Sequence, residues 1–178
     1  MSQVLYCLAA VIVFAFFALT TQSSESEAAS TLVEREIETA AHGVAQRWSA
    51  QVKARAFDEA DTAGGLGLRT TTAGLTASPA FGPDDTEAGL DQFDDVDDFD
   101  GLAIQDTALV GAARDRPVAF DVTAAVTYRT DALGVSTSAT LTKEVALTVT
   151  EVGAVDRPPV RIEVPVHVTA ASQHLRTR

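Results

Sequence analysis

Six aspartates lie within ten residues of this chain, between Asp91 and Asp100. Carboxylate oxygens are the ligands that calcium prefers, and the ion takes about six to eight oxygens. Five of the six aspartates could supply several oxygens from one turn: Asp94, Asp95, Asp97, Asp98 and Asp100. A bound cation would also offset the mutual repulsion that raises the pKa of neighbouring carboxyl groups. The segment therefore predicts either a calcium site or a solvated acidic loop that is screened by salt.

The spacing of these aspartates differs from that of an EF-hand. In the closest fragment, which ends at Gly101, Val96 stands where the first ligand belongs and Thr107 where the closing glutamate belongs. Clustered like charges also disfavour a helix or a buried strand here. We expect a loop whose aspartates face outward or converge on an ion, and which is anchored by Phe93, Val96, Phe99 and Leu102.

Composition excludes several classes of function. The chain has 178 residues, enough for one modest domain and an appendage, and a net charge of −12 argues against nucleic acid as a partner. A single cysteine, Cys7, provides no disulfide framework. The histidines, His42, His167 and His174, have no serine or cysteine nucleophile at the spacing of a known catalytic motif. We therefore expect no enzymatic activity.

The N-terminus carries an uninterrupted apolar run over residues 4–19. With the two threonines that follow, it approaches the length of a membrane-spanning helix. A cleaved signal peptide ending near Ala28 is the alternative, but residues 1–3 contain no basic side chain. We therefore expect a single-pass anchor in the cytoplasmic membrane. Because Glu25 and Glu27 follow the run, we expect the C-terminal domain on the outer side.

A polar, small-residue bridge over residues 20–30 separates this run from a predicted long helix. Thr31 and Glu34 match a capping box at the start of that helix. Apolar residues then recur at helical spacing and form one stripe: Leu32, Val33, Ile37, Ala40, Ala41, Val44, Trp48 and Val52. The charged residues mostly face away from the stripe, so we expect the helix to cover a sheet with Trp48 in the core.

Three segments in the second half alternate apolar and polar residues as half-buried strands do. They span residues 118–128, 141–149 and 160–168, and short loops between them predict antiparallel neighbours. Pro165 lacks a backbone N–H, so the third strand should lie at an edge. We expect an α+β fold divided into a membrane segment (1–21), a bridge and helix (22–60), a glycine-rich connection with the acidic loop (61–116), an antiparallel sheet (117–170) and a tail (171–178).

Three short sequence motifs resemble those of the MSHA-type minor pilins, which belong to the type IV pilin class. They are Ala54-Arg55-Ala56-Phe57-Asp58-Glu59, Phe93-Asp94-Asp95-Val96-Asp97-Asp98-Phe99 with Gly101-Leu102, and Lys143-Glu144-Val145-Ala146-Leu147-Thr148-Val149-Thr150. The resemblance covers about residues 34–150, and the aspartate-rich motif (93–102) is its strongest part. It implies a helix packed on an antiparallel sheet, and a structural role in a type IV pilus or secretion-type assembly with other pilin-like subunits or copies of this chain as partners.

One feature departs from the prepilin pattern. Prepilins carry a basic leader ending in glycine and, five residues into the mature chain, a glutamate, whereas here no acidic residue precedes Glu25. We expect either a pilin-like protein that does not enter a filament or a start of translation elsewhere, so polymerisation is not carried over. A membrane-tethered binding module, holding a ligand outside the cell without polymerising, is the alternative function.

Overall fold

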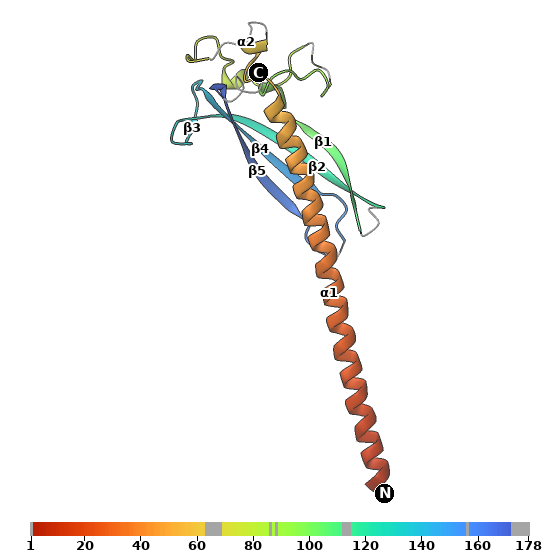
Figure 1. Cartoon of the computed structure of the whole chain (residues 1–178). Helices are drawn as coiled ribbons and strands as arrows, with labels where there is room; N and C mark the ends of the chain where they lie inside the picture. The colour runs from red at the N-terminus through yellow and green to blue at the C-terminus, as the bar shows by residue number, and fades with distance from the viewer. Residues whose placement is uncertain are drawn as a thin grey trace.

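The computed structural model describes residues 2–62, 69–85, 87, 89–111, 115–155 and 157–171. The expected α+β class is confirmed, because a long helix lies against an antiparallel sheet (Figure 1). The helices are α1 (Ser2–Ala54) and α2 (Glu59–Thr62), with two 3-10 helices, η1 (Ser78–Ala80) and η2 (Asp97–Phe99). The N-terminal part of α1 extends beyond the sheet, and loops gather at the opposite end of the molecule (Figure 1).

The sheet runs in the order β1-β2-β4-β5, with every neighbouring pair antiparallel. Its strands are β1 (Ala103–Val110), β2 (Arg116–Arg129), β4 (Thr142–Glu151) and β5 (Arg161–Thr169), and the short β3 (Val135–Ser136) pairs with the end of β2. The three predicted strands are confirmed as β2, β4 and β5, and β5 lies at the edge expected from Pro165. Strand β1 was missed, because it falls inside the segment that we expected to be a connection.

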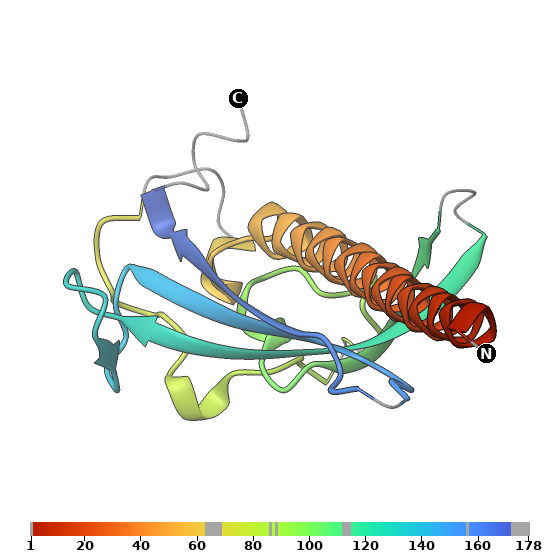
Figure 2. The ribbon, with the colours of Figure 1, turned by 90° about the horizontal axis from the view of Figure 1, so that it is seen from below.

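The C-terminal half of α1 covers one face of the sheet, as Figure 2 shows along the helix axis. Six of its side chains are buried in the core: Ile37, Ala41, Val44, Ala45, Trp48 and Val52. On the sheet side the core contains Val122, Leu147 and Val166. The predicted stripe is therefore largely confirmed. Leu32 is the exception, because it lies where α1 leaves the sheet and is 62% exposed.

Helix α1 is continuous from Ser2 to Ala54, so the expected start at Thr31 was wrong. The segment 20–30 contains neither proline nor glycine, the residues that most strongly interrupt a helix. Its first two hydroxyl groups also find partners within the helix, because Thr20 and Thr21 each donate to the carbonyl of Phe17 at 2.8 Å. Hydroxyl groups that bond back to the preceding turn are compatible with a helix interior.

Candidate functional sites

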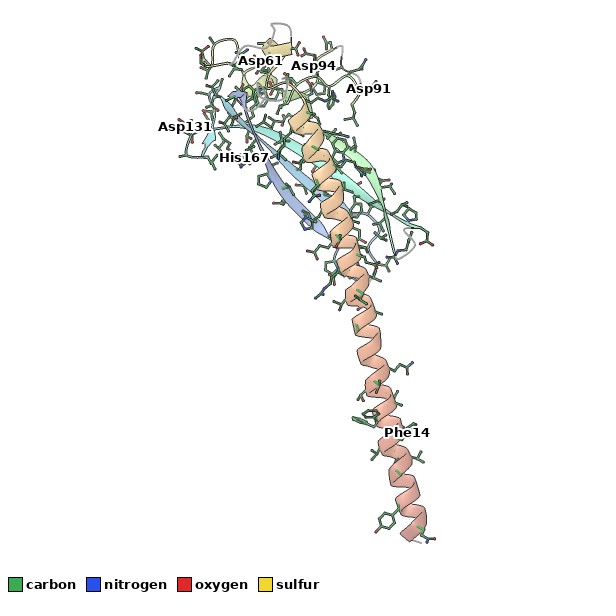
Figure 3. The ribbon with its side chains drawn as sticks, viewed as in Figure 1. Phe14, Asp61, Asp91, Asp94, Asp131 and His167 are labelled. Atoms are coloured by element: carbon green, nitrogen blue, oxygen red, sulfur yellow. The ribbon has the colours of Figure 1, made fainter. Side chains whose placement is uncertain are left out.

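The N-terminal part of α1 presents apolar side chains that no other described element covers. Eight of them are between 60% and 75% exposed: Tyr6, Val11, Ile12, Val13, Phe14, Phe16, Phe17 and Leu19. Phe14 extends from the projecting part of the helix, far from the strands (Figure 3). Within the described residues, no helix meets the combined length and apolarity needed to cross a membrane.

The free energy that would be gained by burying this apolar surface is comparable to the stability of a whole small domain. Burying one valine, leucine, isoleucine or phenylalanine side chain is worth about 1.5–3 kcal/mol, so the seven between Val11 and Leu19 represent on the order of 10–20 kcal/mol. A whole domain is typically stable by about 5–15 kcal/mol. Contiguous exposed apolar surface of this kind marks a contact site for lipid or for protein.

The acidic loop is held between the end of α1 and the sheet. The Ala56 amide donates to the carbonyl of Asp94 at 2.9 Å, and the Gly82 amide donates to that of Asp97 at 3.0 Å. All four predicted anchors are buried: Phe93, Val96, Phe99 and Leu102. The rings of Phe93 and Phe99 meet edge to face, with centroids 5.4 Å apart. The expected anchoring is confirmed.

The expectation that the aspartates face outward was wrong for Asp95, Asp97 and Asp98, which are all buried. Two of them accept amide hydrogen bonds from the turn itself. Asp95 Oδ1 accepts from the amides of Asp97 (2.6 Å) and Asp98 (3.3 Å), while Asp98 Oδ2 accepts from those of Asp94 (2.9 Å) and Asp95 (3.0 Å). The expectation that like charges exclude a helix here was also wrong, because Asp97–Phe99 form the 3-10 helix η2 and short carboxylates can cap a tight turn in this way.

The structure separates the five predicted calcium ligands into different surroundings. Asp100 faces strand β2, where its Oδ1 accepts the amide of Val126 at 2.7 Å. Asp94 is exposed and belongs to an outer group with Glu87 and Asp98, whose carboxylate oxygens lie within 4.8 Å of one another.

The other predicted ligands gather around a small cavity of about 20 Å³. Asp95, Asp97 and Asp98 line it, together with two exposed carboxylates that the sequence did not single out as ligands, Glu59 and Asp84. The acidic groups lie at the end of the molecule far from Phe14, as the positions of Asp61, Asp91 and Asp94 indicate (Figure 3). The cavity therefore joins residues from three separate segments of the chain.

A buried lysine lies beneath this loop and was missed in the sequence. Lys143, on β4, is fully buried, and its Nζ donates to the carbonyl of Phe57 at 2.7 Å and to Asp58 Oδ2 at 2.9 Å. It also forms an ion pair with Asp97 Oδ1. The sequence did indicate its burial, because residues 143 and 145 are two apart on one strand and Lys143 therefore lies on the same face of the sheet as the core residue Val145.

Three aromatic rings complete the surroundings of this lysine, and backbone amides hold its partner Asp58. Its Nζ lies 4.6 Å from the ring centroid of Phe57 and 5.4 Å from those of Phe81 and Tyr128, within the range of cation–π attraction. Asp58 is held from the other side by the amides of Ala60 and Thr76 at 3.3 and 3.0 Å. The ammonium group is therefore fixed in one place between the segment that follows α1, strand β4 and η2.

Burial raises the pKa of the inner aspartates. Desolvation, followed by the nearby charge of Asp97, raises the pKa of Asp95 to about 7. Desolvation raises the pKa of Asp97 to about 6, although the charge of Lys143 opposes the change. Desolvation also raises the pKa of Asp98 to about 7, against the effect of its backbone hydrogen bonds. The loop therefore holds carboxyl groups for which the ionised form is costly without a compensating positive charge.

The remaining polar contacts are distributed over the head of the molecule, which is the sheet together with the C-terminal half of α1 and the loops. Asp106, on β1, accepts from Trp48 Nε1 at 2.9 Å and from Arg47 at 2.7 Å. His42 is exposed on α1, and His167 lies 3.5 Å from Glu144, while His174 falls outside the described residues. The absence of an enzymatic activity stays a prediction.

Comparison with protein-family models, curated proteins and solved structures found no match. The resemblance to minor pilins therefore rests on the three sequence motifs given above.

Proposed function

We propose that this chain is a pilin-like envelope protein, a structural component of a type IV pilus or secretion-type assembly, anchored through the N-terminal part of α1. The observation that carries the proposal is the exposed apolar surface of that part of the helix. Its partners are the cytoplasmic membrane and the corresponding helices of pilin-like subunits. The folded head lies outside the membrane.

The two parts of α1 differ in a way that supports this function. The part on the sheet has one buried stripe and a charged opposite face, as a helix on the surface of a domain has. Residues 11–19 are apolar on every side. A helix that is apolar all round is normally buried in a membrane or in a bundle of helices. One continuous helix therefore links the head to apolar surroundings outside it.

The distribution of charge agrees with this arrangement. The acidic groups marked by Asp61, Asp91 and Asp94 lie at the end of the head remote from the N-terminus of α1 (Figure 3). Anionic lipid headgroups repel a negatively charged protein surface that lies close to them. With the helix anchored, this surface points away from the membrane.

Paired charge substitutions test the anchoring. Phe14→Asp with Phe17→Asp should move the full chain from the membrane pellet to the soluble fraction, because an aspartate near the middle of a membrane costs about 2.5–3.5 kcal/mol. Val135→Asp with Val155→Asp is the matched control, since these valines are equally exposed but lie on the head. Equal sedimentation of both double variants with the membranes would contradict the proposal.

Cysteine cross-linking separates assembly from simple tethering. In a Cys7→Ser background, Phe14→Cys leaves one thiol per chain, so oxidation should give disulfide-linked dimers in sheared surface material if the helices pack together. Monomers and dimers confined to the membrane fraction would instead favour the membrane-tethered binding module. The exposure of Phe14 makes this position reactive without disturbing the head.

A further inference from the structure

The cavity beneath η2 is lined mainly by oxygen-bearing groups. Five carboxylates and one hydroxyl group contribute to it: Glu59, Thr76, Asp84, Asp95, Asp97 and Asp98. Its volume of about 20 Å³ is enough for one particle of the size of a water molecule. The carboxylates come from α2, from the loop around Asp84 and from the acidic loop that contains η2. One ion in the cavity would therefore contact three segments of the chain.

One of these carboxylates lacks the partners that its burial requires. Asp97 is 3% exposed, and its Oδ1 pairs with the ammonium group of Lys143. The hydroxyl of Thr76 lies close to the carboxylate, but Oδ2 meets no hydrogen-bond geometry with the described residues and has no ion-pair partner there. A buried carboxylate oxygen without a partner costs several kcal/mol, so a ligand bound in the cavity would stabilise it.

The balance of buried charge also indicates a cation in the cavity. Lys143 is the only buried cation among the described residues, and four aspartates are buried around it: Asp58, Asp95, Asp97 and Asp98. One ammonium group cannot neutralise four ionised carboxylates in a region of low dielectric constant. A divalent cation in the cavity would remove most of the excess negative charge.

We infer that this cavity binds one calcium ion through Asp95, Asp97 and Asp98, with the exposed carboxylates of Glu59 and Asp84 also lining it. No nitrogen or sulfur ligand lines the cavity, which disfavours zinc and copper. Magnesium demands near-ideal octahedral geometry and is seldom held by an all-protein set of ligands, whereas calcium accepts an irregular shell of about six to eight carboxylate and carbonyl oxygens.

The ion would stabilise the far end of the head. It would link α2, the loop around Asp84 and η2, and the residues before η2 are already joined to those that follow α1 through the hydrogen bond between Ala56 and Asp94. The site differs from the outer group of Glu87, Asp94 and Asp98, with which it shares one residue. The two sites are distinguished by Asp95, which belongs to the cavity alone, and by Asp94, which belongs to the outer group alone.

Calorimetric titration of the chelator-treated full chain in detergent with calcium chloride tests the inference. We expect one site, with a dissociation constant of about 10⁻⁵–10⁻³ M. Calcium at about 100 times that value should raise the Tm by about 5–10 °C. No heat and no change in Tm at about 5 mM calcium would overturn the inference, and so would an equal change in Tm with magnesium.

Single substitutions locate the ion. Asp95→Asn should weaken binding at least about tenfold by removing a charged ligand. The asparagine carbonyl can still accept from the amides of Asp97 and Asp98, so the turn should persist. Asp91→Asn is the matched control in the exposed part of the same loop and should bind as the parent does. Loss of binding in Asp94→Asn together with normal binding in Asp95→Asn would refute the cavity and identify the outer group.

Discussion

Replacing Lys143 with methionine tests whether its ammonium group holds the acidic loop against the sheet. Methionine keeps an unbranched side chain of similar length and can still pack against the surrounding rings. It removes the positive charge, the hydrogen bonds to Phe57 and Asp58, and the ion pair with Asp97. The substitution therefore changes the charge of the buried cluster with little change in its volume.

The expected loss in the free energy of unfolding is about 3–5 kcal/mol, because removing one partner of a buried ion pair leaves the other charge uncompensated. Asp58 would keep the amides of Ala60 and Thr76, whereas Asp97 would lose its only ion-pair partner among the described residues. The cation–π contacts add to the loss, since they act on an ammonium group that is 0% exposed.

Urea denaturation of the full chain in detergent with a chelator present measures the change, provided that the slope of the transition is the same for parent and variant. Arg161→Met is the matched control, because Arg161 forms an exposed ion pair with Glu163. Exposed pairs contribute about 0–1 kcal/mol, so the control should unfold almost as the parent does.

A double-mutant cycle identifies the cause of the loss. Combining Lys143→Met with Asp97→Asn should cost less than the two single losses added together, because the second substitution removes the charge that the first one leaves unpaired. Additive losses, or a loss below about 1 kcal/mol for Lys143→Met alone, would refute the reasoning. Either result would mean that the inner carboxyl groups do not depend on the ammonium group.

Three further predictions concern the core, the loop and pH. Trp48→Ala should cost about 3–5 kcal/mol in urea denaturation, as a large-to-small change in a packed core, and a loss below about 1 kcal/mol would mean that α1 does not depend on the sheet. Phe93→Ser with Phe99→Ser should expose the loop to limited proteolysis while the circular dichroism of the sheet persists, and an uncut loop would contradict the anchoring. Since the folded-state pKa of Asp95 and of Asp98 is raised to about 7 from an ordinary value of about 4, their contribution to stability is greatest at low pH and is lost as the pH rises through about 7. The chelated chain should therefore melt at a higher temperature at pH 6 than at pH 8, and a Tm that is unchanged or lower at pH 6 would contradict these shifts.

Sequence patterns predicted the elements whose burial repeats regularly. The strands β2, β4 and β5 alternate cleanly, so their faces could be assigned before their partners were known. Strand β1 was missed because Asp106 interrupts its apolar face. The structure explains that exception, since Asp106 accepts hydrogen bonds from Trp48 and Arg47 on the helix that covers it. A polar residue can occupy the inner face where another element supplies its partners.

The extent of α1 shows a different limit of sequence patterns. Thr31 and Glu34 form a valid capping pair, but a cap is only a local preference, worth about 1 kcal/mol. The segment before it contains no residue that ends a helix, and its threonines bond within the helix. Helix continuity therefore outweighed the capping signal.

The sequence by itself determined which residues anchor the acidic loop, because Phe93 and Phe99 are large apolar side chains in an otherwise polar segment and their burial is favourable. Only the tertiary structure decided which aspartates would be buried. Lys143 is 85 residues from Asp58 along the chain, and the two meet because β4 passes beneath the end of α1. The burial of a carboxylate depends on such long-range partners, because the cost of desolvation is offset only by charges and donors that the fold brings together.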